Sequence, residues 1–124
     1  MTSERLLVID DEADFANFVA RVARGLGFDV EIVTESRAFK SVIARFVPDI
    51  IVLDLVMPDI DGIDIIRFLA ESGSRARVVV TTGFNPAYAR AACGLGIANG
   101  RLSVTTLLKP VTLAELRASL VQPS

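Results

Sequence analysis

Apolar residues in this chain gather in short runs separated by stretches with helical spacing. The most apolar run, Ile50 to Leu53, is followed at once by Asp54 and then by Pro58 and the turn residues Asp61-Gly62. Such a run is typical of a strand buried on both faces, as in the middle of a parallel sheet covered by helices. Because ligands of such sheets bind outside the carboxyl ends of the strands, Asp54 is expected to point its charge into a site.

Four further segments have the composition of strands. They are Arg5 to Ile9, Phe28 to Ile32, Arg77 to Thr82 and Ser103 to Leu108. The second alternates apolar residues with acids and the last is the most polar, so these two are predicted to lie at the edges of the sheet. The segment Arg5 to Ile9 is followed by Asp10-Asp11-Glu12, and the segment Arg77 to Thr82 ends on a hydroxyl. Polar groups therefore lie at the ends of several predicted strands.

Five segments show the spacing of helices. They are Phe15 to Leu26 before Gly27, a segment capped by Ser36 that runs to Phe46 before Pro48, Ile65 to Leu69 before Gly73, Asn85 to Ala92, and a last helix with the capping box Thr112 to Glu115. The last helix is expected to bury Leu113, Leu116 and Leu120. Gly94, Gly96 and Gly100 disfavour continuation of the fourth helix, and Cys93 to Arg101 is interpreted as a fraying helix followed by a loop.

Alternation of five strands with five helices predicts a single α/β domain over residues 1–124. Right-handed crossovers and the two expected edge strands favour a flavodoxin-like (βα)5 doubly wound parallel sheet with strand order 2-1-3-4-5. In this order the first and third strands are neighbours where the winding reverses. Asp10, Asp11 and Asp54 are therefore expected to converge although they lie far apart in the sequence.

Composition narrows the class of protein. A length of 124 residues allows one ordinary domain, and a formal net charge of -2 gives no reason to expect direct nucleic-acid binding. No apolar stretch approaches the roughly 20 residues that span a bilayer, and no leader pattern precedes the first strand, so a cytoplasmic protein without membrane contact is expected. The lone Cys93 excludes an internal disulfide, and the absence of His leaves oxygen ligands, which suit Mg²⁺.

The expected cluster of carboxylates needs a cation. Two unit charges about 4 Å apart repel by on the order of 4 kcal/mol at an effective dielectric of about 20, and Mg²⁺ reverses that sign. Lys109 follows the fifth strand and can place an ammonium at the same rim, where Thr82 offers a hydroxyl. These groups can stabilise charge on a phosphoryl oxygen, and Asp54 is the acid that can act as a nucleophile.

Each of these residues has a plainer interpretation when it is taken alone. Asp10 and Asp11 are then helix caps, Asp54 is a turn residue, Thr82 bonds the local backbone and Lys109 is a solvated charge. The coincidence of four such strand ends at one edge of the sheet favours the functional interpretation. Asp14, Asp59, Asp61 and Asp64 show no such convergence and are interpreted as solvated or turn residues.

Four motifs resemble those of the receiver domain of two-component response regulators, in the same order along the chain. They are Val8-Ile9-Asp10-Asp11-Glu12, Leu53-Asp54-Leu55-Val56-Met57-Pro58-Asp59-Ile60-Asp61-Gly62, Val80-Thr81-Thr82-Gly83-Phe84 and Leu108-Lys109-Pro110. The resemblance implies a phosphorelay protein that takes a phosphoryl group from a sensor histidine kinase or a histidine phosphotransfer protein. It implies a phosphoacceptor domain, not a turnover enzyme.

The resemblance also implies a role for each site residue. Asp54 is the phosphoacceptor and a Mg²⁺ ligand, Asp11 binds Mg²⁺ directly, Asp10 binds it largely through water, and Val56 binds it through its backbone carbonyl. Thr82 and Lys109 contact the phosphoryl oxygens, and Lys109-Pro110 is expected to be cis. Thr82 is preferred to Thr81 because the family's hydroxyl residue usually precedes a small residue, here Gly83.

Two departures from the family pattern bear on how a signal leaves the site. The family often has an aromatic residue three positions before the lysine, where this chain has Thr106. The segment between Thr82 and Lys109 is also about one helical turn longer than usual, around Cys93 to Arg101. The fourth helix and fifth strand, which many receivers use for output or for a homodimer, therefore cannot be assigned a partner by resemblance.

Two other functions stay open at the level of sequence. A pseudo-receiver, which is an interaction module not regulated by phosphorylation, is compatible with Thr106 but not favoured by the complete set of site residues. A phosphatase of the haloacid dehalogenase type also uses an Asp at a strand end, but its second Asp is replaced by Val56. Val56, two residues after Asp54, and Phe84, two residues after Thr82, are expected to flank the path of the water that would hydrolyse the phosphoaspartate. Neither offers that water a polar group, so a slowly decaying phosphoaspartate is expected.

Overall fold

The computed structural model describes residues 4–83, 87, 90–91, 94 and 102–121 of the chain. Its strands form one parallel sheet in the order β2-β1-β3-β4-β5, as predicted. The strands are β1 (Arg5–Ile9), β2 (Asp29–Val33), β3 (Ile50–Asp54), β4 (Arg77–Thr82) and β5 (Ser103–Leu108). The flavodoxin-like arrangement and the neighbouring positions of the first and third strands are thereby confirmed.

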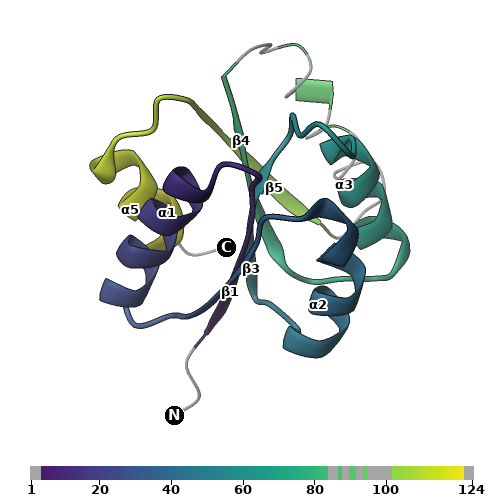
Figure 1. Cartoon of the computed structure of the whole chain (residues 1–124), viewed down its shortest axis with the longest axis horizontal. Coiled ribbons are helices and arrows are strands. Elements are labelled where there is room, and N and C mark those ends of the chain that lie inside the picture. Colours follow the sequence, from purple (N-terminus) through teal and green to yellow (C-terminus); the bar gives the residue numbers. More distant parts are fainter. Residues whose placement is uncertain (1–3, 84–86, 88–89, 92–93, 95–101, 122–124) are drawn as a thin grey trace.

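Helices cover both faces of this sheet (Figure 1). Helices α1 (Ala13–Gly25) and α5 (Leu113–Val121) lie on one face, and α2 (Phe39–Phe46) and α3 (Gly62–Glu71) lie on the other. Within the described part of the chain, no helix is long and apolar enough to cross a membrane. Most of the predicted fourth helix and all but Gly94 of the stretch from Cys93 to Arg101 lie outside the described residues.

Strand β3 carries the centre of both hydrophobic cores. All five of its residues are buried. Ile51 and Leu53 pack into the cluster beneath α2 and α3, whereas Ile50 and Val52 pack into the cluster beneath α1 and α5. This alternation follows from the period of two along a strand, because successive side chains point to opposite faces of the sheet. The apolar run before Asp54 is therefore a strand buried on both faces, as its composition predicted.

Two details of the helices differ from the sequence prediction. Ser36 does not cap α2, because it opens the 3-10 turn η1 (Ser36–Ala38), and its buried Oγ has no hydrogen-bond partner among the described residues. Leu113 is 44% exposed, although Leu116 and Leu120 are buried as predicted. Leu113 is the first residue of α5, at the carboxyl edge of the sheet, where the strands that cover Leu116 have ended.

The capping box of α5 is present as the sequence predicted. The Thr112 N–H donates to Glu115 Oε1 over 2.9 Å, and the Glu115 N–H donates to Thr112 Oγ1 over 3.1 Å. These two bonds satisfy backbone donors that the first turn of a helix leaves without an intrahelical partner. The hydrogen bond from the Thr112 N–H, helped by the Thr112 side chain, also lowers the pKa of the Glu115 carboxyl. The chain is thereby fixed three residues after Lys109.

A close approach of two backbones fixes the loop between β3 and α3. The Gly62 N–H donates to the Leu55 carbonyl over 3.0 Å, and a Cβ on Gly62 would lie 2.6 Å from Leu55 Cα. Asp61 caps α3 by accepting a hydrogen bond from the Ile63 N–H over 2.9 Å. Asp61 was interpreted as a solvated or turn residue, and the structure gives it this more specific role. Glycine at 62 is required by space at this point.

The substitution Gly62→Ala should lower the free energy of unfolding by about 1 to 3 kcal/mol, because the added methyl group meets backbone atoms that cannot rotate away. Gly25→Ala is the matched control. A Cβ on Gly25, the last residue of α1, meets nothing within 4 Å, and Ala favours the helix by up to about 1 kcal/mol. Urea unfolding of both variants measures the difference, and equal stability of the two would contradict this account.

Candidate functional site

Acidic side chains meet at the carboxyl ends of β1 and β3. Asp10, Glu12 and Asp54 each place a carboxylate oxygen within 4.8 Å of the others. Parallel pairing brings them together, because Ile9 is paired with Leu53 and the acids follow at the same edge. The predicted convergence of Asp10 and Asp54 is confirmed. Asp11 is exposed and lies outside this group, although its charge contributes to the raised pKa of Asp54.

Burial makes two of these acids resist ionisation. Asp54 is 5% exposed, and burial raises its pKa to about 6. The negative charges of Asp10 and Asp11 raise the Asp54 pKa further. The Val56 N–H, which donates to Asp54 Oδ1 over 3.1 Å, and the charge of Lys109 lower it. Asp10 is 1% exposed, and burial likewise raises its pKa, although the Glu12 N–H donates to its Oδ1 over 2.8 Å. Both groups are costly to hold as anions without a cation.

Lys109 supplies a positive charge to this cluster. Its Nζ lies 3.3 Å from Glu12 Oε1, 3.4 Å from Asp10 Oδ2 and 3.7 Å from Asp54 Oδ2. Burial disfavours its ammonium form, but the charges of Asp10 and Asp54, together with the hydrogen bond and charge of Glu12, outweigh burial and raise its pKa. Lys109 follows β5 directly, and its peptide bond to Pro110 is cis, as the resemblance implied. The sequence thus predicted correctly that the lysine reaches the acids of the first and third strands.

The donor set fits a hard divalent cation. Among the described residues the cluster offers oxygen atoms alone, and two of its carboxylates are buried and would gain from a positive charge. Glu12 was named with the acids after the first strand but was not selected as a site residue. Its position directly after Asp10-Asp11 is the sequence signal that could have included it. The roles of Asp11 and the Val56 carbonyl toward a metal stay predictions.

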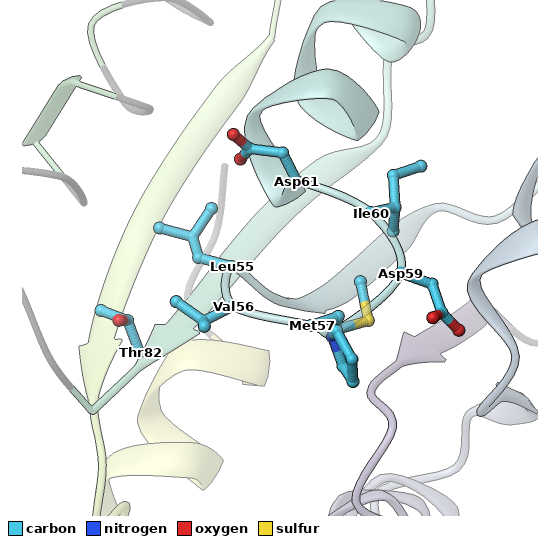
Figure 2. A pocket seen from close by; sticks show the side chains of 8 residues that line it. Leu55, Val56, Met57, Asp59, Ile60, Asp61 and Thr82 are labelled. Atoms are coloured by element: carbon cyan, nitrogen blue, oxygen red, sulfur yellow. The ribbon is translucent and has the colours of Figure 1, made fainter.

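A pocket of about 520 Å³ adjoins the cluster, between the loop after β3 and the end of β4 (Figure 2). Its lining comprises Leu55, Val56, Met57, Pro58, Asp59, Ile60, Asp61 and Thr82. Figure 2 shows Thr82 beside Val56 at one end of the pocket. Thr82 lies at the end of β4, whereas the Thr81 hydroxyl donates to the Leu53 carbonyl over 3.4 Å inside the sheet. Thr82 therefore lines the pocket, and its contact with a phosphoryl group stays a prediction.

A backbone bond links two of the predicted site residues. The Lys109 N–H donates to the Thr82 carbonyl over 2.9 Å, which continues the pairing of β4 with β5. Thr106 is half-buried in β5 and is paired with Val80. A small polar side chain therefore occupies the position at which the family often has an aromatic residue.

Comparison with known proteins agrees with this geometry. The family model of the response regulator receiver domain matches residues 6–121. The DNA-binding response regulator MtrA of Mycobacterium tuberculosis is 38% identical over 71 residues, which are 56% of this chain and 31% of MtrA. The transcriptional regulatory protein TrcR of the same organism is 31% identical over 116 residues, which are 94% of this chain and 43% of TrcR. The chain thus spans less than half the length of these relatives.

Solved structures show the same fold. A response regulator from Colwellia psychrerythraea is 30% identical with a TM-score of 0.78, and the match covers 96% of this chain and 94% of that one. The chemotaxis protein CheY4 of Vibrio cholerae is 19% identical with a TM-score of 0.82, and the match covers 96% and 97%. On the strength of the family match over residues 6–121, the chain belongs to the response regulator receiver domains of two-component signalling.

Proposed function

We propose that this receiver domain is a phosphorylation-dependent switch in which Asp54 accepts a phosphoryl group in the presence of Mg²⁺. The donor is a phosphohistidine on a sensor histidine kinase or a histidine phosphotransfer protein. The observation that carries the proposal is the state of Asp54, a buried carboxylate with its pKa raised to about 6, held 3.7 Å from the Lys109 ammonium beside further acids. Such a group is a poised nucleophile next to a site for positive charge.

The protein's own residues prepare the attack. The Val56 N–H holds Asp54 Oδ1, and the other oxygen, Oδ2, faces Lys109. An Asp54 oxygen attacks the phosphorus, the bond from phosphorus to the imidazole nitrogen breaks, and its electron pair returns to the imidazole, which leaves an acyl phosphate on Asp54. Bound Mg²⁺ supplies positive charge to the phosphoryl and carboxylate oxygens.

Asp10, Asp54 and the acids beside them would hold Mg²⁺, and Lys109 and Thr82 would contact the new phosphoryl oxygens. Phosphorylation adds negative charge where Lys109 now contacts Asp10, Glu12 and Asp54. Drawing Lys109 and Thr82 toward that charge would bias the surface around the fourth helix and β5. To move the ratio of active to inactive conformation from 1:99 to 99:1, phosphorylation must favour the active conformation by about 5.5 kcal/mol.

The proposed setting is cytoplasmic, with the kinase or phosphotransfer protein as the partner and without direct nucleic-acid or membrane contact. MtrA is a DNA-binding response regulator, and the match with this chain covers 31% of the length of MtrA. The domain is proposed to act as a phosphoacceptor that assists its own phosphorylation and dephosphorylation, and not as a turnover enzyme. A homodimer through the fourth helix and β5 is compatible with this role.

Without metal, the substitution Asp54→Asn should stabilise the protein at neutral pH. The pKa of Asp54 is about 6 in the folded state against 3.8 as its ordinary value, so the folded state binds more protons between these values. Wild-type stability therefore falls as the pH rises from about 4 to 6, by on the order of 2 to 3 kcal/mol. At pH 7.5 in EDTA, Asp54→Asn should exceed wild type by up to that amount, and the difference should shrink below about pH 4.

The control for this comparison is Asp59→Asn, which removes an exposed acid from the same loop. It should leave the pH dependence of stability unchanged. Addition of Mg²⁺ at pH 7.5 should stabilise wild type and Asp59→Asn but not Asp54→Asn. Thermal or urea unfolding measures all three proteins, and a wild type that gains no stability from Mg²⁺ would favour the pseudo-receiver function instead.

Acetyl phosphate or phosphoramidate with Mg²⁺ should phosphorylate the protein on Asp54. The expected result is one added phosphoryl group by intact mass in wild type and in Asp59→Asn, and none in Asp54→Asn, because the amide is a poor nucleophile. EDTA should abolish the modification. Labelling of Asp54→Asn to the same extent as wild type would reject Asp54 as the phosphoacceptor.

The phosphorylated form should persist well beyond seconds. Val56 is 47% exposed beside the site and offers no polar group to a hydrolytic water, and Phe84, the second apolar position, lies outside the described residues. Val56→Asn should speed loss of the phosphoryl group about 2- to 10-fold, the range that one hydrogen bond to the water provides, whereas Val56→Leu should not. The decay is followed by mass spectrometry after the donor is removed, and loss within seconds in wild type would contradict the expectation.

A further inference from the structure

The aromatic ring of Phe15 lies against the ammonium of Lys109. Nζ is 4.5 Å from the ring centroid, within the range of about 6 Å over which a cation is attracted to the face of a ring. Phe15 stands in the first turn of α1, and Lys109 follows β5, so the contact joins the start of α1 to the segment after β5. The sequence prediction placed Phe15 in the first helix and gave it no part in the site.

The carboxylates near Lys109 hold its ammonium through long contacts, which include hydrogen bonds from Nζ to Glu12 Oε1 and Asp10 Oδ2. The distances from Nζ to Glu12, Asp10 and Asp54 are 3.3, 3.4 and 3.7 Å, whereas a strong ammonium–carboxylate hydrogen bond measures about 2.7 to 2.9 Å. The Glu12 side chain is 65% exposed, so water and salt weaken its attraction. Asp10 and Asp54 are the acids that a divalent cation or a phosphoryl group would also engage. A lysine on a flexible four-carbon stem therefore needs a further contact that does not change with the charge of the site.

The Phe15 ring has the required property, because it is uncharged and its attraction for the ammonium is independent of whether the acids are free, protonated or bound to metal. Its own position is set by packing. Phe15 is half-buried and packs against the core beneath α1 and α5. The nearby Phe18 ring, 6.1 Å away between centroids, contributes apolar surface that a leucine also provides. The ring thus provides a fixed surface at the rim of the site.

We infer that Phe15 is a positioning residue for Lys109 and holds its ammonium where it meets the phosphoryl group that arrives on Asp54. This role rests on the proposed function. The ring keeps the ammonium at the rim while Asp10 and Asp54 exchange one counter-charge for another. Phe15 itself touches neither the phosphoryl group nor the metal.

The composition of the chain allows a direct test by NMR. The chain contains two lysines, Lys109 and Lys40, so lysine labelled with ¹³C gives two sets of side-chain signals. The ε-methylene protons of Lys109 should be shifted upfield by the Phe15 ring in wild type and in Phe15→Tyr, but not in Phe15→Leu. Lys40, which lies 5.3 Å from the Phe68 centroid, is the internal reference and should not change. Phe18→Leu, which removes the neighbouring ring, is the matched control and should leave Lys109 shifted.

The same proteins separate positioning from mere packing when they are phosphorylated with phosphoramidate and Mg²⁺. Phe15→Leu should lower the maximal rate about two- to fivefold, with little change in the donor concentration at half-maximal rate, because Lys109 acts on the transferring group. Phe15→Tyr should restore the rate, and Phe18→Leu should match wild type. Equal losses in the two leucine variants would reduce Phe15 to a packing residue.

Two further results would overturn the inference. One is a Lys109 signal that is the same in wild type and Phe15→Leu, and the other is an upfield shift in wild type that disappears when Mg²⁺ is added. Failure of the proposed function is seen separately, as a wild type that takes up no phosphoryl group. In that case the positioning role in transfer falls with it, while the metal-free NMR comparison still decides whether the ring holds Lys109.

Discussion

The structure depends on holding two acids side by side at the carboxyl edge of the sheet, with most of their contact to water removed. Asp10 and Asp54 are 1% and 5% exposed, and burial raises the pKa of each. At about 4 Å, two such charges repel by on the order of 4 kcal/mol at an effective dielectric of about 20. The Lys109 ammonium opposes that repulsion from the end of a third strand. Positive charge at this edge therefore stabilises the two buried acids in their ionised form.

The packing of the rest of the fold offsets the free-energy cost of burying these two acids. Strand β3 is buried along its whole length and contributes to both hydrophobic cores, so the main chain at Asp54 has little freedom to move away from Asp10. The approach of Gly62 to Leu55 closes the following loop, and the same loop turns the Val56 N–H toward Asp54 Oδ1. Tight packing of apolar residues and the Val56 N–H thus orient the Asp54 carboxylate.

Periodicity and composition predicted the sheet well, because its strands are apolar runs that end on polar groups. Arg77–Thr82 and Ser103–Leu108 have the predicted bounds, and strand order followed from the edge character of the second and fifth strands. Side-chain contacts that depend on where elements meet were not predictable. The ring of Phe15 against Lys109 arises where the first turn of α1 approaches the segment that follows β5, and no local pattern encodes that approach. The exposure of Leu113 has the same origin, since helical spacing does not say where the sheet ends.

Threonine at position 106 limits the ways in which a conformational change at Asp54 can be transmitted to the rest of the domain. An aromatic side chain there could swing between two places, whereas a threonine in a strand has little reach. The structure offers a shorter connection, since the Lys109 N–H is bonded to the Thr82 carbonyl and the pairing of β4 with β5 ends at these residues. Thr82 and Lys109, whose side chains are proposed to contact the phosphoryl group, are therefore joined directly by a backbone hydrogen bond. A displacement of either side chain would therefore shift the ends of both β4 and β5.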